Sequence, residues 1–571
     1  MISPKPTVLL EPTPEAAFDI EHKLGINPTV ARILAVRGYL ADDTLLDFLQ
    51  PRLKNIALPD KLPDLDIAME RIIGEIVSGR TIGIFGDYDV DGIGSASIWH
   101  KFFKALRIPD HTIISRRERG YGLTIKDVDE FLSNGVTFII AIDVGSTDYE
   151  AIDHAVKNSV DVVIVDHHHL TPPYPRAVAI VNPLRHDSDF SYTSMASVGL
   201  SFYLVAALRS KLLTDGYFSE HELPDVKKYL DIVSLGTLAD VAPLNGINRK
   251  LTSFGLNLIR NKMNPAIKAL ADASGIDFLE KISEKSIIFK LVPKLNAPGR
   301  MGDAHISFEL LTTHNYSKAL KIAKRLEEIN VSRQKLQEKM LREATMQATA
   351  SLDYRWPVVV SGEDWHPGIV GIVAAKLAEQ FKRPAAAVAL INGDTGRGSV
   401  RSYGGANIYA ALDQLKDLLI SFGGHEGAAG IEIKRSKIGS FATEMDRILK
   451  PTDTDKDILL KVDTEASFIE ITPEFLDQME LLAPFGNSNP EIILYTKKLE
   501  VLSVRYPKSV HLSLLLRDPV SRIVHRAIGF NMAESFSQVS QFVNAVYVPE
   551  RDFFRGGKSI QLRLLHIWSD N

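Results

Sequence analysis

Three aspartates alternate in one short stretch of the sequence, Gly86-Asp-Tyr-Asp-Val-Asp-Gly. The stretch follows a run of apolar residues, so Asp87, Asp89 and Asp91 are expected in the loop after a buried strand. Carboxylates this close together raise one another's pKa, and a bound divalent cation removes that cost. An EF-hand calcium loop is excluded because its twelfth residue must be Glu, whereas here it is Ile98. A solvated turn with Asp caps is the weaker alternative, since Asp87 directly follows the apolar run.

A second cluster, Asp166-His-His-His, follows another apolar run at 160–165. Imidazole is a softer ligand than carboxylate and favours Mn²⁺ over Mg²⁺. Adjacent residues of an extended chain point to opposite faces, so alternate members of the cluster can reach one metal. His167 and His168 are therefore expected to divide the roles of metal ligand and of acid or substrate contact.

Two single aspartates complete the set. Asp143 follows the apolar run 136–142, where a carboxylate at the end of a strand can bridge two metals, although a helix N-cap explains it equally well. Asp240, in Leu-Ala-Asp-Val-Ala-Pro, is a weak signal by itself. Together these residues supply enough oxygen and nitrogen ligands for two metal ions. Two such ions about 3.5–4 Å apart activate a water and stabilise a leaving oxygen in phosphoryl hydrolysis, with no Ser or Cys nucleophile.

The elements that must position these side chains alternate between strand and helix. Buried strands are predicted at 81–86, 136–142 and 160–165. Helices are predicted at 93–106, 125–132 and 149–157. The alternation is typical of a parallel, doubly wound α/β sheet, in which ligands bind beyond the carboxyl ends of the strands.

The rest of the chain divides into further parts. Residues 193–275 are expected to be mostly helical, and the stretch 303–356 contains no Gly or Pro. A helix over 316–351 would be roughly 54 Å long, the size of a strut between two domains. Its mixed charges fit a solvated helix face better than a nucleic-acid stripe. Residues 357–450 return to α/β character, with a strand at 385–390.

The last part, 455–571, alternates apolar and polar residues and predicts a small β-barrel. From 501 onward it has nine Lys and Arg against five Asp and Glu, so it is locally basic. The predicted organisation is an N-terminal helical segment, a catalytic α/β domain, a connecting helix, a second α/β domain and the barrel. Their predicted boundaries are 1–55, 56–315, 316–351, 352–452 and 453–571.

Composition limits the function. The chain has 571 residues and a formal net charge of −5, which disfavours a passive nucleic-acid coat and permits an enzyme with locally basic grooves. It contains no cysteine, which excludes disulfides and Cys-ligated zinc and fits a reducing compartment. No apolar signal core is present at the start, and no run approaches the roughly 18 apolar residues that span a bilayer. We expect a cytoplasmic protein that is not bound to a membrane.

The order and spacing of these motifs resemble a known family. The aspartate triplet, Asp143-Val-Gly, the Asp-His-His cluster and the later Asp240 resemble the DHH phosphoesterase superfamily. The second half carries segments similar to its DHHA1 domain, and the remaining motifs and the length resemble the RecJ-like exonucleases over about 50–570. The DHHA1-like segments begin at Trp365 (WHPGIVGIVA), Gly396 (GRGSVRS) and Phe422 (FGGHEGAAG). The motifs that resemble the RecJ-like exonucleases are Lys294 onward (KLNAPGRMGD) and Arg116…Gly120-Tyr-Gly-Leu.

The resemblance implies an enzyme that degrades single-stranded DNA from its 5′ end with Mn²⁺ or Mg²⁺, in DNA repair and recombination. It implies that Asp87 and Asp89 hold one metal, and that Asp143 bridges to the other. His168 would contact the scissile phosphate or transfer a proton. The implied ligands of the second metal are Asp91, His167 and Asp240.

The resemblance also implies where the substrate binds. Arginine forks suit phosphate, and glycine-rich loops let backbone amides approach it. The barrel resembles an OB fold that binds single strands, with Tyr506, Phe553 and Phe554 as candidate stacking residues. Expected partners are single-stranded DNA, a single-strand-binding protein and a helicase. The expected phosphate contacts are Arg116, Arg300, Ser399, Arg401, Ser402, Gly423, Gly424 and His425.

Two other functions are considered. A DHH phosphatase acting on nano-oligonucleotides or other small phosphorylated substrates would typically be shorter and lack the barrel. A non-catalytic DNA-binding scaffold would have lost metal ligands, whereas every ligand position is filled here. Residues 185–199 depart from the family pattern, which is expected to affect local packing or strand contacts and not the metal site.

Overall fold

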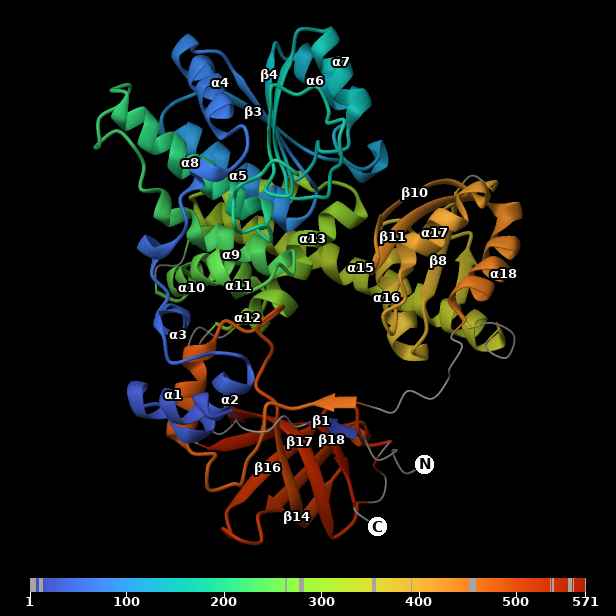
Figure 1. The fold of residues 1–571 in the computed structure, drawn as a ribbon. Helices are drawn as coiled ribbons and strands as arrows, with labels where there is room; N and C mark the ends of the chain where they lie inside the picture. The colour runs from blue at the N-terminus through green and yellow to red at the C-terminus, as the bar shows by residue number, and fades with distance from the viewer. Residues whose placement is uncertain are drawn as a thin grey trace.

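A computed structural model describes residues 7–9, 14–261, 264–276, 282–351, 356–391, 393–450, 459–534, 536, 539–552, 557 and 559–569. Figure 1 shows three bodies: an α/β domain coloured blue to green, a smaller α/β domain in yellow to orange, and a red barrel with blue helices against it. A single long helix runs from the first body into the second. The predicted α/β class and the predicted order of the parts are confirmed.

The first domain is built on a sheet of five parallel strands. They are β2 (Ile82–Gly86), β3 (Asp110–Ile114), β4 (Phe138–Ile142), β5 (Asp161–Val165) and β6 (Ala179–Val181). Their order is β3-β2-β4-β5-β6. The helices that cover this sheet are α4 (Leu65–Ser78), α5 (Val90–Ala105), α6 (Ile125–Ser133), α7 (Tyr149–Lys157) and α8 (Ser197–Thr214).

Both faces of this sheet are covered. Successive side chains of a strand point to opposite faces. In β4, Phe138 and Ile140 pack with α4, α5 and α8, whereas Ile139 and Ala141 pack with α6 and α7. This double burial explains why the strands are apolar throughout and confirms the doubly wound sheet.

A helical layer completes the first domain. Its members are α9 (Leu230–Ala239), α10 (Gly246–Asn261), α11 (Pro265–Ala273), α12 (Glu284–Ser286), α13 (Val292–Met301) and α14 (His305–Thr312). The connecting helix α15 covers Tyr316–Ser351, as predicted.

Helix α15 belongs to two hydrophobic cores. Ala319 and Leu326 are buried in the core of the first domain, and Met340 and Ala344 in that of the second. Arg333 departs from the expected solvated face, because it is buried and donates to Asn330 and Gln337. The two domains are therefore joined by a rigid element that each of them packs around.

The second domain is a mixed sheet in the order β10-β11-β9-β8-β7, in which only the β7–β8 pair is parallel. Helix α16 and the end of α15 cover one face, and α17 and α18 cover the other. The strands are β7 (Val358–Gly362), β8 (Ala385–Ile391), β9 (Thr395–Arg401), β10 (Leu419–His425) and β11 (Ala428–Lys434). The helices are α16 (Val370–Phe381), α17 (Ile408–Gln414) and α18 (Ile438–Leu449).

The third body is a closed five-stranded barrel. Its strands are β14 (Leu494–Arg505), β15 (Leu512–Arg517), β16 (Val524–Gly529), β17 (Phe542–Arg551) and β18 (Ile560–Trp568). They pair in the order β14-β15-β16-β18-β17, and β17 pairs with β14 to close the ring. Strand β13 (Thr464–Glu465) joins β14, and α19 (Pro473–Met479) packs into the barrel core.

The N-terminal helices pack against the barrel although they are distant from it in sequence. They are α1 (Ala16–Leu24), α2 (Pro28–Val36) and α3 (Asp43–Leu49). Ile20, Ile33 and Leu45 share a hydrophobic core with barrel residues, because short helices cannot bury an apolar stripe alone. Strand β1 (Thr7–Leu9) also pairs with β12 (Leu459–Lys461). In the part of the chain that the structure describes, no helix is both long and apolar enough to cross a membrane.

Candidate active site

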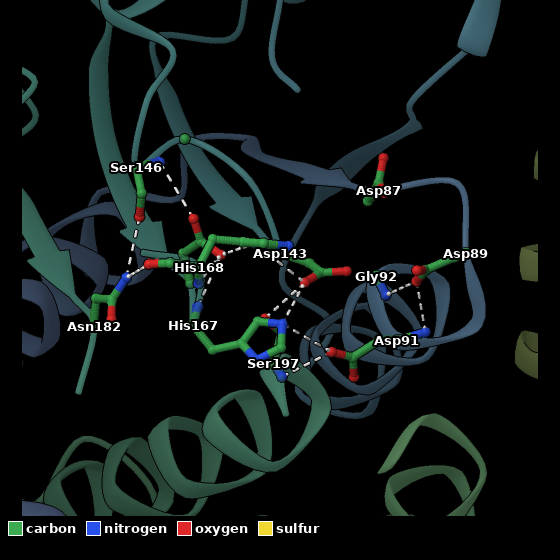
Figure 2. Close-up of polar contacts among 12 residues, drawn as sticks. Asp87, Asp89, Asp91, Gly92, Asp143, Ser146, His167, His168, Asn182 and Ser197 are labelled. Atoms are coloured by element: carbon green, nitrogen blue, oxygen red, sulfur yellow. Dashed lines mark hydrogen bonds and ion pairs between the residues drawn. The ribbon is translucent and has the colours of Figure 1, made fainter. Parts of the chain in front are cut away.

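An aspartate follows each of three adjacent strands at one edge of the first sheet. Asp87 follows β2, Asp143 follows β4 and Asp166 follows β5, and they are 3%, 2% and 1% exposed. Neighbouring strands lie about 4.8 Å apart, so these three carboxyl groups converge. Figure 2 shows Asp143 beside His167, His168 and Asp91, with Asp87 and Asp89 on the neighbouring turn of the chain.

The aspartate triplet forms the turn from β2 into α5. Asp89 is the N-cap of α5, and its Oδ1 accepts hydrogen bonds from the amides of Asp91 (2.9 Å) and Gly92 (3.1 Å). A Cβ atom at Gly92 would lie 2.5 Å from the backbone nitrogen of Asp87, so only glycine fits there. The alternating acids are therefore tied to one tight turn, and Ser115 Oγ donates to Asp87 Oδ1 at 2.7 Å.

The N-terminus of α8 supports two of the acids. The amides of Ser197 and Val198 donate to the two carboxylate oxygens of Asp91 at 2.8 and 2.9 Å. Ser197 Oγ donates to Asp143 Oδ1 at 3.0 Å. Ser197 and Val198 stand at the end of the unusual segment 185–199, so this end of the segment borders the proposed metal site. The sequence contains no ligand pattern that would have identified Ser197.

Asp143 adopts a left-handed backbone conformation, with φ of 63°. Its amide donates to the carbonyl of Val165 at 3.0 Å, and His167 Nε2 lies 3.3 Å from its Oδ1. The N-cap alternative does not apply, because α7 begins at Tyr149 and Asp148 precedes it. A non-glycine residue in this conformation is held there by its surroundings.

His168 is oriented by the aspartate that begins its motif. Its Nδ1 lies 2.7 Å from Asp166 Oδ1, and Asp166 Oδ2 accepts from the Ser146 amide at 3.3 Å. His168 Nε2 lies 3.2 Å from the hydroxyl of Tyr121. Burial alone would raise the pKa of Asp166, but the hydrogen bond and charge of His168 hold it below its usual range. Asp166 therefore serves as an ionised partner of His168, a role that the predicted ligand set omits.

Three other buried aspartates of the site have raised pKa values, so their ionised forms are disfavoured in the absence of a counter-charge. Burial and the nearby Asp89 raise the pKa of Asp87 to about 7, and burial and Asp240 raise that of Asp91 to about 7. Burial, Asp91 and Asp89 raise the pKa of Asp143 well above its usual range. Crowded ionised carboxylates at a buried edge are stable only with a counter-charge, and divalent cations supply it.

The donor atoms fall into three groups that are each compact enough for a metal ion. Within each group the ligand atoms lie within 4.8 Å of one another. The groups are Asp87, Asp89 and Asp143; Asp91, His167 and Asp240; and Asp143, His167 and His168. Asp143 belongs to the first and third groups, and His167 belongs to the second and third. Carboxylate oxygens with an imidazole suit Mn²⁺ or Mg²⁺, so the residues present fit such ions.

A second cluster, which we call the arginine cluster, lies between the first two domains and consists of Arg117, Arg300, Arg333 and Arg401. The guanidinium of Arg117 lies 4.2 Å from the ring centre of Tyr88, within the aspartate turn. Burial and the charge of Arg117 lower the pKa of Arg300 to about 10, and Arg333 also lowers it. The cluster therefore begins beside the metal-ligand turn.

Two glycines of the second domain bring Arg401 close to the cluster. A Cβ atom at Gly368 would lie 2.0 Å from the Arg300 carbonyl, and one at Gly371 would lie 2.9 Å from Arg401 Nη2. Arg401 donates to Ser399 Oγ. The predicted contacts Ser399 and Arg401 thus bond each other, and the segment 368–371 that packs against the backbone of Arg300 also lies against Arg401.

The remaining predicted contacts lie farther along the second domain. Strand β10 pairs with β11, which pairs with β9, so Gly423 is aligned with Ser399 and His425 with Arg401, two strand spacings away. The Ser402 amide donates to the Gly427 carbonyl at 2.9 Å, next to these paired residues. These residues share one corner of the sheet. The glycine at 424 pairs with Ala429 and has φ of 146°.

Arg116 is separated from this cluster. Its Nη2 lies 3.7 Å from Glu130 on α6, whereas its neighbour Arg117 reaches Tyr88 and the Gly299 carbonyl. Adjacent residues of an extended chain point apart, so only one of them can face the site. The sequence Arg116-Arg-Glu-Arg does not indicate which. Of the candidate stacking residues, Tyr506 is 39% exposed, and Phe553 and Phe554 lie outside the described residues.

The fold and this site define a metal-dependent phosphoesterase of the DHH class. The family model for the DHH N-terminal domain matches residues 81–237, and that for the DHHA1 domain matches 355–451. The model for the RecJ OB domain matches residues 462–566.

Comparison with individual proteins shows which family of this class the chain is similar to. The chain is 30% identical to the single-stranded-DNA-specific exonuclease RecJ of Salmonella typhimurium over 97% of its own length and 98% of that protein. It is 32% identical to the RecJ of Bacillus subtilis over 92% of its length, but spans only 65% of that protein. The crystal structure of RecJ from Thermus thermophilus in complex with Mn²⁺ superposes with a TM-score of 0.84, at 25% identity, over 99% of this chain and 79% of that one. The chain belongs to the RecJ family.

Proposed function

We propose that this chain removes nucleotides from the 5′ end of single-stranded DNA by two-metal hydrolysis, in DNA repair and recombination. The observation that carries the proposal is the convergence of acids, His167 and His168 into three compact donor groups that are linked through Asp143 and His167. The relatives are single-stranded-DNA-specific exonucleases, which supports the substrate, and the 5′ polarity rests on the family resemblance.

Asp87 and Asp89 would hold one ion and Asp91, His167 and Asp240 the other, with Asp143 between them. When bound, the two ions activate a water molecule and stabilise the leaving oxygen. The chain holds the donors in place through Ser115, Ser197 and the amides of α8.

His168 is assigned to the scissile phosphate or to proton transfer. Asp166 binds its Nδ1, so its Nε2 is left to face Tyr121 and the open side of the site. Its side chain is 44% exposed, against 18% for His167. This difference supports a ligand role for His167 and a substrate-facing role for His168.

The arginine cluster is assigned to the DNA backbone. Its guanidinium groups repel one another, and a phosphate group relieves this repulsion through charge-assisted hydrogen bonds. Ser399, Ser402, Gly423, Gly424 and His425 would extend this contact surface along the second domain, and Arg116 would contribute from its rim.

The barrel is assigned to the following single strand. Five-stranded barrels of this type bind single strands through basic grooves and stacking aromatic residues. Its presence favours long strands over the small phosphorylated substrates of other DHH enzymes. A non-catalytic scaffold is disfavoured because all six proposed ligand positions carry Asp or His.

The test uses purified protein and single strands labelled at either end, with Mn²⁺ or with EDTA. We expect the 5′ label to be released first as a short product, only with the metal. Early release of the 3′ label would contradict the polarity, and cleavage of dinucleotides with no degradation of long strands would favour the small-substrate enzyme. A single-strand-binding protein and a helicase as partners, and a cytoplasmic location, stay predictions.

A further inference from the structure

The loop that leads into the barrel reaches the first domain at the turn after Asp240. Gly486 and Asn489 exchange backbone hydrogen bonds of 2.8 and 3.1 Å, so residues 486–489 form a tight turn. Asn487 at its tip bonds to both ends of the turn 241–244. It accepts from the Leu244 amide through its carbonyl at 2.7 Å, and its Nδ2 donates to the Val241 carbonyl at 3.0 Å.

The turn that Asn487 holds is strained. Helix α9 ends at Ala239, Asp240 is its C-cap, and Val241 follows with φ of 57°. Glycine is usual at this position of a helix end, whereas a β-branched residue is a clear outlier. Val241 is 62% exposed, so burial of its side chain does not hold it in this conformation. Contacts to its backbone do so: the amides of Val241 and Ala242 donate to the carbonyls of Leu238 and Thr237, and Asn487 donates to the Val241 carbonyl.

Asn487 is presented by a rigid support. Asn489 Nδ2 donates to the carbonyls of Leu482 and Pro484, each at 2.8 Å. Arg249 of α10 donates to the Leu482 carbonyl at 2.9 Å, and Glu284 of α12 accepts from the Phe485 amide at 2.9 Å. The loop is thus fixed to the first domain on either side of its contact with the turn.

Close packing adds to this restraint. A Cβ atom at Gly486 would lie 2.8 Å from Leu244 Cδ1, so the two backbones meet at short range. Within the first domain, Tyr192 and Asn248 bond the Pro243 carbonyl, beyond Val241. The Val241 carbonyl, which is next to Asp240, is bonded from the barrel side.

We propose that Asn487 is a positioning residue for Asp240, so that the barrel loop sets the place of one metal ligand. This inference rests on the proposed function, because Asp240 is a ligand only if the site binds metal. It adds that the group Asp91, His167 and Asp240 depends on a residue from another domain.

The test is equilibrium binding of Mn²⁺ to the full chain without DNA, followed by the paramagnetic resonance signal of free Mn²⁺. Asn487→Asp keeps a turn-forming side chain but replaces the Nδ2 donor with a carboxylate that cannot bond the Val241 carbonyl. We expect one of two Mn²⁺ sites to lose affinity about tenfold, the lower end of what loss of an outer-shell partner causes. Asp240→Asn gives the scale of a full loss, and Leu481→Ala, an exposed position just before the same loop, should bind Mn²⁺ like the wild type.

Rescue separates positioning from general instability. Glycine adopts the conformation of Val241 without strain, so Asn487→Asp with Val241→Gly should recover most of the Mn²⁺ affinity. Unchanged affinity in Asn487→Asp, or a loss that Val241→Gly leaves in place, would overturn the inference.

Degradation of single-stranded DNA by the wild type is measured separately. A wild type that binds Mn²⁺ and leaves DNA intact removes the proposed function, while the affinities still decide the role of Asn487. If the wild type degrades DNA and the Asn487→Asp variant binds Mn²⁺ normally, the proposed function stands and the role of Asn487 is overturned.

Discussion

The metal-ligand edge and the arginine cluster are built in different ways. The metal ligands come largely from loops that follow adjacent strands of one sheet, so the topology of a single domain brings them together. The arginines come from the segment after β3, from α13, from α15 and from β9, in two domains. The proposed metal site is therefore formed within one domain, whereas the arginine cluster forms only when both domains pack around α15.

The two regions also have opposite electrostatics. At the sheet edge, burial and neighbouring carboxylates raise the pKa of Asp143. In the cluster, burial and Arg117 lower the pKa of Arg300. Each region contains like charges that a partner of opposite sign would stabilise, a cation in one case and a phosphate in the other.

The largest expected effect is at the metal-ligand edge. Asp143→Asn should lower kcat on single-stranded DNA by roughly 10³-fold, because the shared carboxylate charge is lost. Asparagine tolerates the left-handed backbone better than alanine does, so the fold is preserved. In EDTA the melting temperature should rise, because one of several repelling buried charges is removed. Near-normal turnover with Mn²⁺ would contradict the two-metal assignment, and a lower melting temperature would contradict the electrostatic interpretation.

Substitution within the arginine cluster should change KM for single-stranded DNA more than kcat. Arg401→Ala should raise KM for single-stranded DNA about 10–100-fold, the cost of losing hydrogen bonds from a charged group, with kcat changed about twofold or less. Arg397→Ala, an exposed position on the same strand, is the matched control. Equal effects of the two variants would mean that β9 contributes only general positive charge.

The pH dependence sharpens the contrast further. Because the folded-state pKa values of Asp87 and Asp91 are raised to about 7, their neutral forms are favoured in the metal-free fold. Stability of that fold should fall as pH rises from about 4, the unfolded value, to about 7. Metal binding needs the ionised forms, so apparent Mn²⁺ affinity should be at least about tenfold weaker at pH 6 than at pH 8. Calorimetric titration at the two pH values checks this, and pH-independent affinity would contradict it.

The smallest expected effect is at the rim of the site. Tyr121→Phe removes the hydroxyl that lies 3.2 Å from His168 Nε2 and should lower kcat about 2–5-fold, the worth of one neutral hydrogen bond. Single-turnover rates on a labelled strand measure it. A loss as large as that of Asp143→Asn would instead place Tyr121 among the catalytic groups.

Much of the metal-ligand edge was predictable from the sequence. The strand before Asp87 is marked by a short apolar run and the helix 316–351 by apolar residues at helical spacing, and the structure has both within a residue or two. The triplet around Asp89 carries its own geometry, because one N-cap and one obligatory glycine fix it. Local patterns suffice where local backbone geometry determines the site.

Contacts between distant segments could not be predicted in the same way. Ser197 bonds Asp143, and Asn487 bonds the backbone after Asp240, across long separations in sequence. The choice between Arg116 and Arg117 depends on a packing direction that no periodicity records. The N-terminal helices pack against the barrel because both need partners for their apolar surfaces, which the linear order conceals.

The helix α15 has a consequence for the size of the product. Because its first half is part of one core and its second half part of another, the two domains cannot rock apart without breaking a packed interior. The distance between the proposed metal site and the arginine cluster is therefore fixed by the packing of the two domains around α15. If the arginine cluster binds a substrate phosphate as proposed, the length of each released fragment would be set by the protein and not by the base sequence.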